Sequence, residues 1–467
     1  MTAPEDVLAE LRALREGDLP THGGRTLAYV YDSALPGLDE LAARAHALAS
    51  SVNGLDPTAF PSLLRLENDV VRTAAALLGG DERTVGTVTS GGTESCLLAV
   101  QAARDARPEV ATPSIVLPET AHAAFHKAAH YFGLRVVAVP VDPVTFRAPV
   151  DAVAAAIGPD TVLVVASAPS YAHGVVDPVA GIAAAARERG VRCHVDACIG
   201  GWVLPHADDV PPFDLSVPGV TSLSVDLHKY AYCPKGTSVL LHADADLRRP
   251  QFFASAAWPG YTMLNATTQS TRSGGPLAAA WAVLKHVGAD GYRELAHRAL
   301  TSARAIRAGV EAIDGLRVLG EPDATLLAVT ADRADFDVFT VADEMKARNW
   351  YLQPQFAFGS SPANLHLTVT AANAGHEEEL LADLRASVAA ALEAGPVRVP
   401  PEVVAAIGAL DPDSLTPREF AGLLAGAGLG GDTVLPDRMA GVNTLLAAAP
   451  PRLRERLLIE FLGVLYS

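Results

Sequence analysis

Between residues 84 and 226, two kinds of hydrophobic pattern follow each other in a regular order. Short valine-rich runs that are apolar on both faces are separated by alanine-rich windows with helical spacing. The runs are TVGTVTS, SIVLP, LRVVAVP, TVLVVASAP, VRCHVDA and SLSVD, and the windows lie at 94–104, 122–131, 150–157 and 179–189. Strands buried on both faces and joined by helices form parallel sheets. The pattern therefore predicts a mostly parallel sheet covered by helices, with ligands at the carboxyl ends of its strands.

Different patterns flank this region. Helical windows are expected before it at 4–16, 39–51 and 66–78. After Gly275 the spacing predicts helices at 276–287, 292–313 and 377–394, together with strands at LRVLG, TLLAVTA and NLHLTVT. A proline cluster at 397–401 then opens a tail in which SLTPREFAGLLAGAG and PPRLRERLLIEFLGVL have helical periodicity.

We therefore predict an α/β protein in four parts. They are an N-terminal arm with helices (1–52), a large domain with the parallel sheet (53–275), a smaller α+β domain (276–396) and a helical C-terminal extension (397–467). The role of the extension stays open between a packing module, a dimer element and a partner site. No helix-turn-helix segment is apparent in it.

Composition and charge narrow the class of protein. Nearly half of the residues are apolar and the formal net charge is -17, so we expect a globular chain whose main partner is neither nucleic acid nor an anionic membrane surface. No run reaches the roughly 18 apolar residues of a membrane span, and the N-terminus lacks a secretion signal. The four cysteines show no paired CxxC spacing. A cytoplasmic location is therefore the expectation.

The stretch Thr221–Leu241, TSLSVDLHKYAYCPKGTSVLL, holds two of the five lysines among the 36 cationic side chains. A chain that otherwise uses arginine for positive charge has kept Lys229 at the end of a strand, with Lys235 six residues later. A lysine amine can lose its proton and form a Schiff base, whereas a guanidinium cannot. By itself Lys229 is equally compatible with a lysine whose stem covers a strand end.

Two further segments carry candidate chemistry. TSGGTES, from Thr89 to Ser95, lies between a strand and a helix, where its glycines and the exposed N–H groups of the helix start form a nest for a phosphate. Asp196 ends the strand VRCHVDA before a Gly-Gly turn. A carboxylate there indicates a partner for a protonated ring nitrogen, or an aspartate that caps the following turn.

His122 begins the segment HAAFHKAAHYF. It could stack over a planar cofactor or could simply occupy the start of a helix. His126 and His130 follow at helical spacing, but no carboxylate spacing accompanies them, so we predict no metal site.

A phosphate nest, an acid at one strand end and a lysine at another, in this order, describe a pyridoxal phosphate site. Each segment has an ordinary structural explanation by itself, and the combination is what favours the cofactor.

The chain resembles the group II pyridoxal-phosphate decarboxylase superfamily, which has the type I aminotransferase fold, and within it the sphingosine-1-phosphate lyases. The stretches that carry the resemblance span about residues 25–395 and are FPSLLRLENDVV, TSGGTES, PETAHAAFHKAAHYFG, SAPSYAHGVVDPV, HVDACIGGWVLP, TSLSVDLHKYAYCPKGTSVLL and STRSGG. The resemblance implies a homodimer with active sites at the subunit interface.

The resemblance also implies roles for individual residues. Lys229 would form the Schiff base, Asp196 would hold the pyridinium nitrogen and His122 would stack on the ring. The phosphate would be held by Gly91, Gly92, Thr93, His228 and, from the other subunit, Thr271. Tyr31, Tyr171 and Lys235 match substrate-side positions, Tyr171 among the catalytic groups.

One departure bears on the substrate. Where the lyase pattern has Asn-x-Leu-His, this chain has Asn53 to Asp56. An aspartate would repel a substrate phosphate unless another cation compensates. Lys235 is the candidate for that cation, or it could pair with Asp56.

The leading hypothesis is a lyase that cleaves a Cα bond of a small amine substrate, most simply retro-aldol cleavage of a β-hydroxy amine to an aldehyde and an amine. Decarboxylation of an L-amino acid is the alternative, because the same site would act on a carboxylate at Cα. A cofactor-binding regulatory protein without turnover is the third possibility.

Overall fold

The computed structural model describes residues 2–56, 58–426 and 436–466, and its largest sheet has seven strands in the order β1-β7-β6-β5-β4-β2-β3. The strands are β1 (Val85–Thr89), β2 (Ser114–Pro118), β3 (Arg135–Val139), β4 (Thr161–Ser167), β5 (Arg192–Asp196), β6 (Ser222–Asp226) and β7 (Ser238–His242). From β6 to β3 all neighbours pair in parallel, while β7 runs antiparallel to β1 and β6. The predicted mostly parallel sheet is confirmed.

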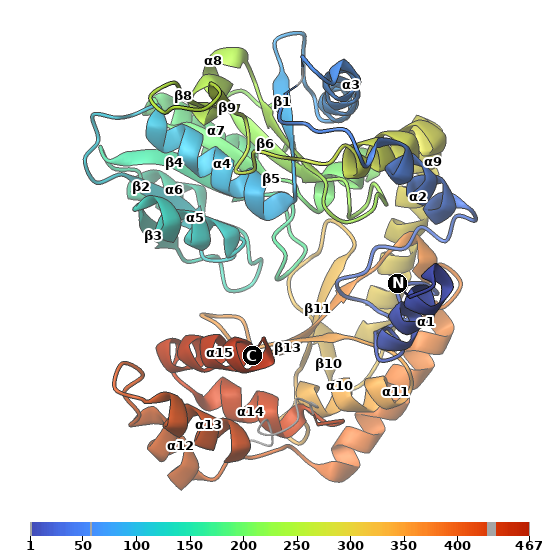
Figure 1. The fold of residues 1–467 in the computed structure, drawn as a ribbon. Helices are drawn as coiled ribbons and strands as arrows, with labels where there is room; N and C mark the ends of the chain where they lie inside the picture. The colour runs from blue at the N-terminus through green and yellow to red at the C-terminus, as the bar shows by residue number, and fades with distance from the viewer. Residues whose placement is uncertain (1, 57, 427–435, 467) are drawn as a thin grey trace.

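Helices cover both faces of this sheet (Figure 1). They are α3 (Pro61–Leu77), α4 (Gly92–Asp105), α5 (Ala124–Phe132), α6 (Val150–Ala156) and α7 (Val179–Glu188). In β2, Ile115 and Leu117 belong to the core formed with α4 and α5, while Val116 belongs to the core formed with α3 and α7. Successive side chains of a strand point to opposite faces, so a run that is apolar throughout needs cover on both.

The second sheet has four antiparallel strands in the order β10-β11-β13-β12. The strands are β10 (Leu316–Val318), β11 (Leu326–Ala331), β12 (Gln353–Gln355) and β13 (Asn364–Thr368), and α10 (Val338–Ala347) and α11 (Glu377–Ala394) pack with them. The long α9 (Gly275–Glu311) leads into this sheet after packing on α2 (Leu38–Ala49). Gly288 has φ 62° and ψ 176°, so α9 bends between the two helical windows predicted from the sequence.

Several elements were not predicted. They are β7, β12, α10, the hairpin of β8 (Phe253–Ser255) and β9 (Met263–Asn265), and the short helical turns α8 (Ala245–Arg248), η1 (Gly200–Trp202), η2 (Leu204–His206), η3 (Arg249–Gln251) and η4 (Ala371–Asn373). Helix α3 begins at Pro61, five residues before the predicted window, because proline suits the first turn of a helix. Helix α1 (Pro4–Leu14) ends two residues before its prediction.

Four helices follow the two sheets and lie together at the foot of Figure 1. They are α12 (Pro401–Gly408), α13 (Pro417–Gly426), α14 (Ala440–Ala448) and α15 (Pro451–Leu465). The predicted helical tail is present at both segments named from the sequence, although the last two residues of SLTPREFAGLLAGAG lie outside the described residues. Among the described helices, none is long and apolar enough to span a membrane.

Candidate active site

A cavity of about 380 Å³ opens at the carboxyl ends of β4, β5 and β6. Ser167, Asp196 and Asp226 end these three strands and all line it, as do Gly91 and Gly92 at the start of α4. Ligands bind at this edge in open α/β sheets because helix starts and strand ends converge there. The site is therefore where the strand pattern placed it.

The start of α4 lines one end of the cavity. The first N–H groups of a helix have no intrahelical partner and carry the positive end of the helix dipole. A Cβ on Gly92 would lie 2.8 Å from both Asp226 Oδ1 and Cys198 Sγ, so a side chain at this position would displace residues that line the cavity. Thr93 and His228 also line the cavity. These features fit a phosphate group.

Lys229 lies in the same cavity, with its Nζ 2.8 Å from Asp226 Oδ2. Burial by itself lowers the pKa of Lys229, but Asp226, with smaller contributions from Tyr31 and Cys198, raises it, and the net pKa lies well above the ordinary value. His228 Nε2 is 3.6 Å from the same carboxylate, and His228 Nδ1 is 2.8 Å from the carbonyl oxygen of Thr237. Asp226 is thus the counter-ion for the lysine that the sequence singled out.

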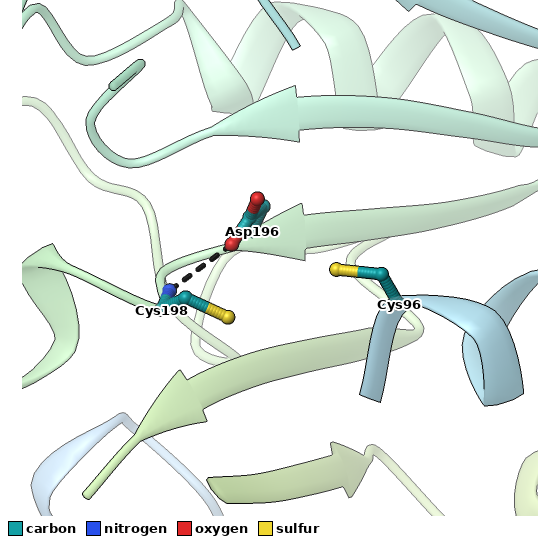
Figure 2. A group of neighbouring side chains, drawn as sticks. All are labelled: Cys96, Asp196 and Cys198. Carbon is teal, nitrogen blue, oxygen red and sulfur yellow. Dashed lines mark hydrogen bonds between the residues drawn. The ribbon is translucent and has the colours of Figure 1, made fainter. Parts of the chain in front are cut away.

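Asp196 is buried at the end of β5 (Figure 2). Its Oδ1 accepts hydrogen bonds from the backbone N–H of Cys198 at 3.1 Å and from Ser224 Oγ at 3.4 Å. The first bond makes Asp196 a cap of the following turn, and its role as the partner of a ring nitrogen stays a prediction. A carboxylate in this position suits a protonated ring nitrogen.

The side chain of Cys96 on α4 points toward those of Asp196 and Cys198 (Figure 2). One carboxylate oxygen and the two Sγ atoms lie within 4.8 Å of one another. Such donors are able to ligate a soft cation, so the prediction that the chain has no metal site stays a prediction. Hydrogen bonding between the thiols and burial raise the pKa of Cys198 well above its usual value.

His122 and Tyr171 lie where this cavity meets a second one, and both line both cavities. Tyr171 donates a hydrogen bond from its hydroxyl to Gln353 Oε1 at 2.6 Å, and its ring stacks on His366 with centroids 4.1 Å apart. His122 is exposed, and its Nδ1 accepts a hydrogen bond from the N–H of Ala124 at 3.1 Å. The ring is therefore held at the start of α5.

Four predicted site residues lie outside the lining of this cavity. Lys235 is near it, donating to the carbonyl of Tyr29 at 2.9 Å with its Nζ 5.1 Å from the ring centroid of Tyr31. Tyr31 is half-buried, and burial raises its pKa to about 12. Thr271 is exposed. The idea that Lys235 pairs with Asp56 is not supported by the contacts that these two described residues make.

Asp56 is an exposed turn residue. Its Oδ1 accepts hydrogen bonds from Thr58 N at 2.8 Å, Thr58 Oγ1 at 2.6 Å and Ala59 N at 3.3 Å. These bonds lower the pKa of Asp56, the Thr58 hydroxyl contributing most. The carboxylate is thus engaged by its own loop within the described chain.

Sequence reasoning missed three groups in the cavity, Asp226, Glu94 and the Cys96–Cys198 pair. Glu94 accepts from Ser90 N at 2.7 Å and Thr268 N at 2.9 Å, which ties the nest to the segment after β9. Asp226 stands three residues before the lysine, and a carboxylate at a buried strand end is the signal that could have found it, as it found Asp196. No sequence signal joined Cys96 to Cys198.

The residues present fit pyridoxal phosphate. The helix start suits the phosphate, Lys229 supplies an amine within the cavity, and Asp196 supplies a buried carboxylate at another strand end. Asp226 Oδ1 is buried without a hydrogen-bond partner among the described atoms, which indicates that this wall of the cavity is built to meet a further polar group.

Comparison with known proteins agrees with this site. Residues 28–331 match the family model "Pyridoxal-dependent decarboxylase conserved domain". The chain is 38% identical over 397 residues to sphingosine-1-phosphate lyase of Dictyostelium discoideum, covering 82% of this chain and 72% of that protein. It is 37% identical to sphingosine-1-phosphate lyase 1 of Rattus norvegicus, covering 82% and 68%.

Solved structures agree as well. A Burkholderia pseudomallei sphingosine-1-phosphate lyase superposes with a TM-score of 0.79 at 37% identity, covering 84% of this chain and 92% of that one. A glutamate decarboxylase of Lactobacillus brevis has a TM-score of 0.75 at 19% identity, covering 86% and 95%, and shares the fold.

A second model, "Pyridoxal-dependent enzyme, C-terminal putative HTH domain", matches residues 401–464. The statement that no helix-turn-helix segment is apparent was therefore wrong, because helical periodicity alone does not reveal how successive helices are arranged. The longer match covers the strands and helices that build the cavity. The chain therefore belongs to the pyridoxal-dependent decarboxylase family and is a lyase whose cofactor is pyridoxal phosphate.

Proposed function

We propose that the protein cleaves the Cα–Cβ bond of a β-hydroxy amine and releases an aldehyde and an amine. Relatives named sphingosine-1-phosphate lyase support the proposal, since sphingosine 1-phosphate carries its amine and a hydroxyl on adjacent carbons. The observation that carries it is the placement of Lys229 Nζ in one cavity with the carboxylates of Asp196 and Asp226.

We assign a separate role to each group that lines the cavity. Pyridoxal phosphate supplies a conjugated ring that draws electrons from the bond to be broken. The start of α4 would hold the phosphate, Asp196 the ring nitrogen and His122 one face of the ring. Since Asp226 accepts from Lys229, the lysine amine is held within the cavity, where it can deliver a proton to carbon after the bond breaks.

Tyr171 acts in this proposal as a neutral hydrogen-bonding group, because its hydroxyl donates to Gln353 and its oxygen can accept from the substrate hydroxyl. Burial, and to a smaller degree the neighbouring Tyr31, raise the pKa of Tyr171 above its ordinary value. The phenol therefore stays neutral at physiological pH and is a poor general base. It orients the substrate hydroxyl, and a water-linked base takes the hydroxyl proton as the Cα–Cβ bond breaks.

Lys235 is the cation proposed for an anionic group on the substrate. Its amine is exposed and lies over the ring of Tyr31, close to the carbonyl of Tyr29. Because Asp56 is engaged by its own turn, the substitution of aspartate for the expected histidine removes one cation without setting an opposing charge against Lys235.

We further propose a cytoplasmic homodimer with the active sites at the subunit interface. Thr271 is exposed and does not line the cavity of its own chain, which supports its action in the site of a second subunit. All four cysteines are unpaired thiols, in keeping with a reducing compartment.

The test is a product assay on the holoenzyme with a panel of β-hydroxy amines, their phosphates and L-amino acids. Aldehyde release from at least one β-hydroxy amine is expected. Release of CO2 from amino acids without any aldehyde would replace the proposal by decarboxylation, and a cofactor band that no amine shifts would point to a regulatory protein.

Lys229→Ala should abolish aldehyde release and also the absorbance band of the bound cofactor, which lies at longer wavelength than the protein absorbance. The reason is that no other lysine lines the cavity in the described part of the chain. Lys285→Ala is the matched control, since Lys285 lies over Trp281 away from the site. A band that survives in Lys229→Ala would show that another lysine binds the cofactor.

A further inference from the structure

A second cavity of about 340 Å³ adjoins the cofactor cavity. We call it the side chamber. His122 and Tyr171 line both cavities and so form the boundary between them. A substrate held at Lys229 therefore has two directions in which to extend, toward Lys235 or into the side chamber.

The chemistry of the side chamber favours an uncharged, apolar group. Val141, Phe146, Phe356 and Phe358 contribute to its lining. Glu119 also lines it and accepts from Val141 N at 3.1 Å, so its carboxylate would repel an anion. An anionic substituent is thus directed to Lys235 and an apolar chain to the side chamber.

Apolar atoms make up most of the surface of the side chamber. Among the polar atoms of its lining residues, Thr120 Oγ1, His173 Nδ1 and Asn364 Oδ1 are buried without a hydrogen-bond partner among the described atoms, and others are engaged by the chain itself. His173 Nε2 lies 3.0 Å from Ser361 Oγ, and the His173 ring stacks on Phe146 with centroids 4.0 Å apart. Asn364 donates to the carbonyl of Pro362 at 3.0 Å. Burial lowers the pKa of His173 to about 4, so the ring is neutral at physiological pH. The walls therefore offer mainly apolar surface.

The outer wall of the chamber contacts the C-terminal helices. The Arg454 guanidinium, from α15, lies 4.8 Å from the ring centroid of Phe356, and the same ring also meets Phe339 of α10, with centroids 5.9 Å apart. Arg454 is itself anchored, donating to the carbonyl of Ala449 at 3.2 Å. Phe356 is thus in contact with two elements that hold it in place.

The C-terminal helices are fastened to the small sheet by specific bonds. The N–H groups of Met439 and Ala440 donate to the Asp343 carboxylate at 2.8 and 2.9 Å, and Arg438 pairs with Glu344 at 2.6 Å.

Residues 401–464 hold eight acidic and five basic side chains, a balance that disfavours a nucleic acid as their ligand.

We propose that the side chamber binds the apolar chain of the substrate and that α15, through Arg454 and Phe356, is a specificity element for that chain. The inference rests on the proposed function and deepens it. Burying one methylene of a ligand tightens binding about fourfold, so a chain lodged in the chamber gives strong selection for length.

The experiment measures the dissociation constants of ethylamine and octylamine from the holoenzyme by the change in cofactor absorbance. This readout needs no turnover, so failure of the proposed cleavage leaves it intact. The native protein should bind octylamine far more tightly than ethylamine, and equal affinities would overturn the proposal.

Ser360→Trp places a bulky ring in the chamber from an exposed loop position. We expect the dissociation constant of octylamine to rise about tenfold or more and that of ethylamine to stay unchanged. Ala357→Trp is the matched control, since Ala357 is exposed on the same loop and outside the chamber lining. An equal effect of Ser360→Trp on both amines would contradict a chain-binding chamber.

Phe358→Ala supplies a second variant whose folding is safe, because the Phe358 side chain is largely exposed. It too should weaken octylamine selectively.

Arg454→Ala tests the role of α15. Loss of the contact with Phe356 should raise the octylamine constant about threefold, while Arg452→Ala, on the same helix and paired with exposed Asp413, should not. If Arg454→Ala and Arg452→Ala behave alike, α15 is not a specificity element.

Discussion

At the residue scale, the contact between Lys229 and Asp226 adds a property that the sequence did not reveal, namely control of the lysine pKa by a neighbouring carboxylate. The scarcity of lysine along the chain was enough to identify Lys229. Asp226 was passed over because it read as the polar end of a strand. In three dimensions the two charged groups lie 2.8 Å apart, with Asp226 buried and Lys229 half-buried, so the aspartate raises the pKa of the lysine.

Asp226→Asn should shift the pH dependence of cofactor capture, by which we mean the rate at which the Lys229 amine bonds to the aldehyde of pyridoxal phosphate. The Asp226 carboxylate raises the pKa of Lys229 against the lowering effect of burial, and only the neutral amine attacks an aldehyde. Capture therefore speeds up as the pH rises. Without the carboxylate the pKa of Lys229 falls, and the midpoint of the rate profile should move down by about one pH unit or more.

Mixing apoenzyme with pyridoxal phosphate at a series of pH values and following the absorbance measures this profile. Asp290→Asn, at an exposed acid that pairs with Arg293, is the control. A midpoint that is the same in both variants would mean that Asp226 does not control Lys229.

At the scale of elements, the strand ends and the start of α4 define the site. The alternation of apolar runs and helical windows was enough to predict six strands in a mostly parallel sheet and to place ligands at the carboxyl ends of its strands. Strand β7 escaped prediction because its five residues follow Lys235 closely and resemble a continuation of the lysine segment. Its antiparallel pairing with β1 and β6 places Ser238 beside Ser95 of α4, with Oγ atoms 3.0 Å apart.

Gly92→Ala should weaken cofactor binding. The added Cβ would come within 2.8 Å of Asp226 and Cys198, and relief of such a clash at the start of α4 should raise the dissociation constant of pyridoxal phosphate about tenfold or more. An absorbance titration of the apoenzyme measures it.

Gly441→Ala is the matched control, because Gly441 lies on α14 and nothing is within 4 Å of the position that a Cβ would take there. Equal cofactor affinity in the two variants would remove the steric argument for glycine at position 92.

At the scale of the whole molecule, the site joins parts that are distant in sequence. The side chamber combines residues 119–146 of the large sheet with residues 355–364 beside β13, and α15 supports it from the end of the chain. The dimer proposed above would add a third contribution, from the loop that carries Thr271.

A subunit-complementation experiment tests that contribution. Lys229→Ala and Thr271→Asp should each be inactive, the second because its carboxylate would face the cofactor phosphate. In a mixed dimer one site would combine native Lys229 with native Thr271 from the other chain. Random co-assembly in equal amounts should therefore restore about a quarter of the native activity.

Separately purified and mixed homodimers that have not exchanged subunits provide the baseline for this measurement. If the co-expressed sample is no more active than this mixture of homodimers, Thr271 acts in the site of its own chain.

The sequence by itself determined the fold class and the cofactor and selected Lys229 and Asp196 as candidate site residues, because strand burial, helix starts and the scarcity of lysine are local signals. Only the tertiary structure decided that Asp226 faces Lys229, that Asp56 is engaged by its own turn, and that Phe356 lies under Arg454. Those contacts join residues from separate elements or depend on the direction of a side chain, and periodicity along the chain contains neither kind of information.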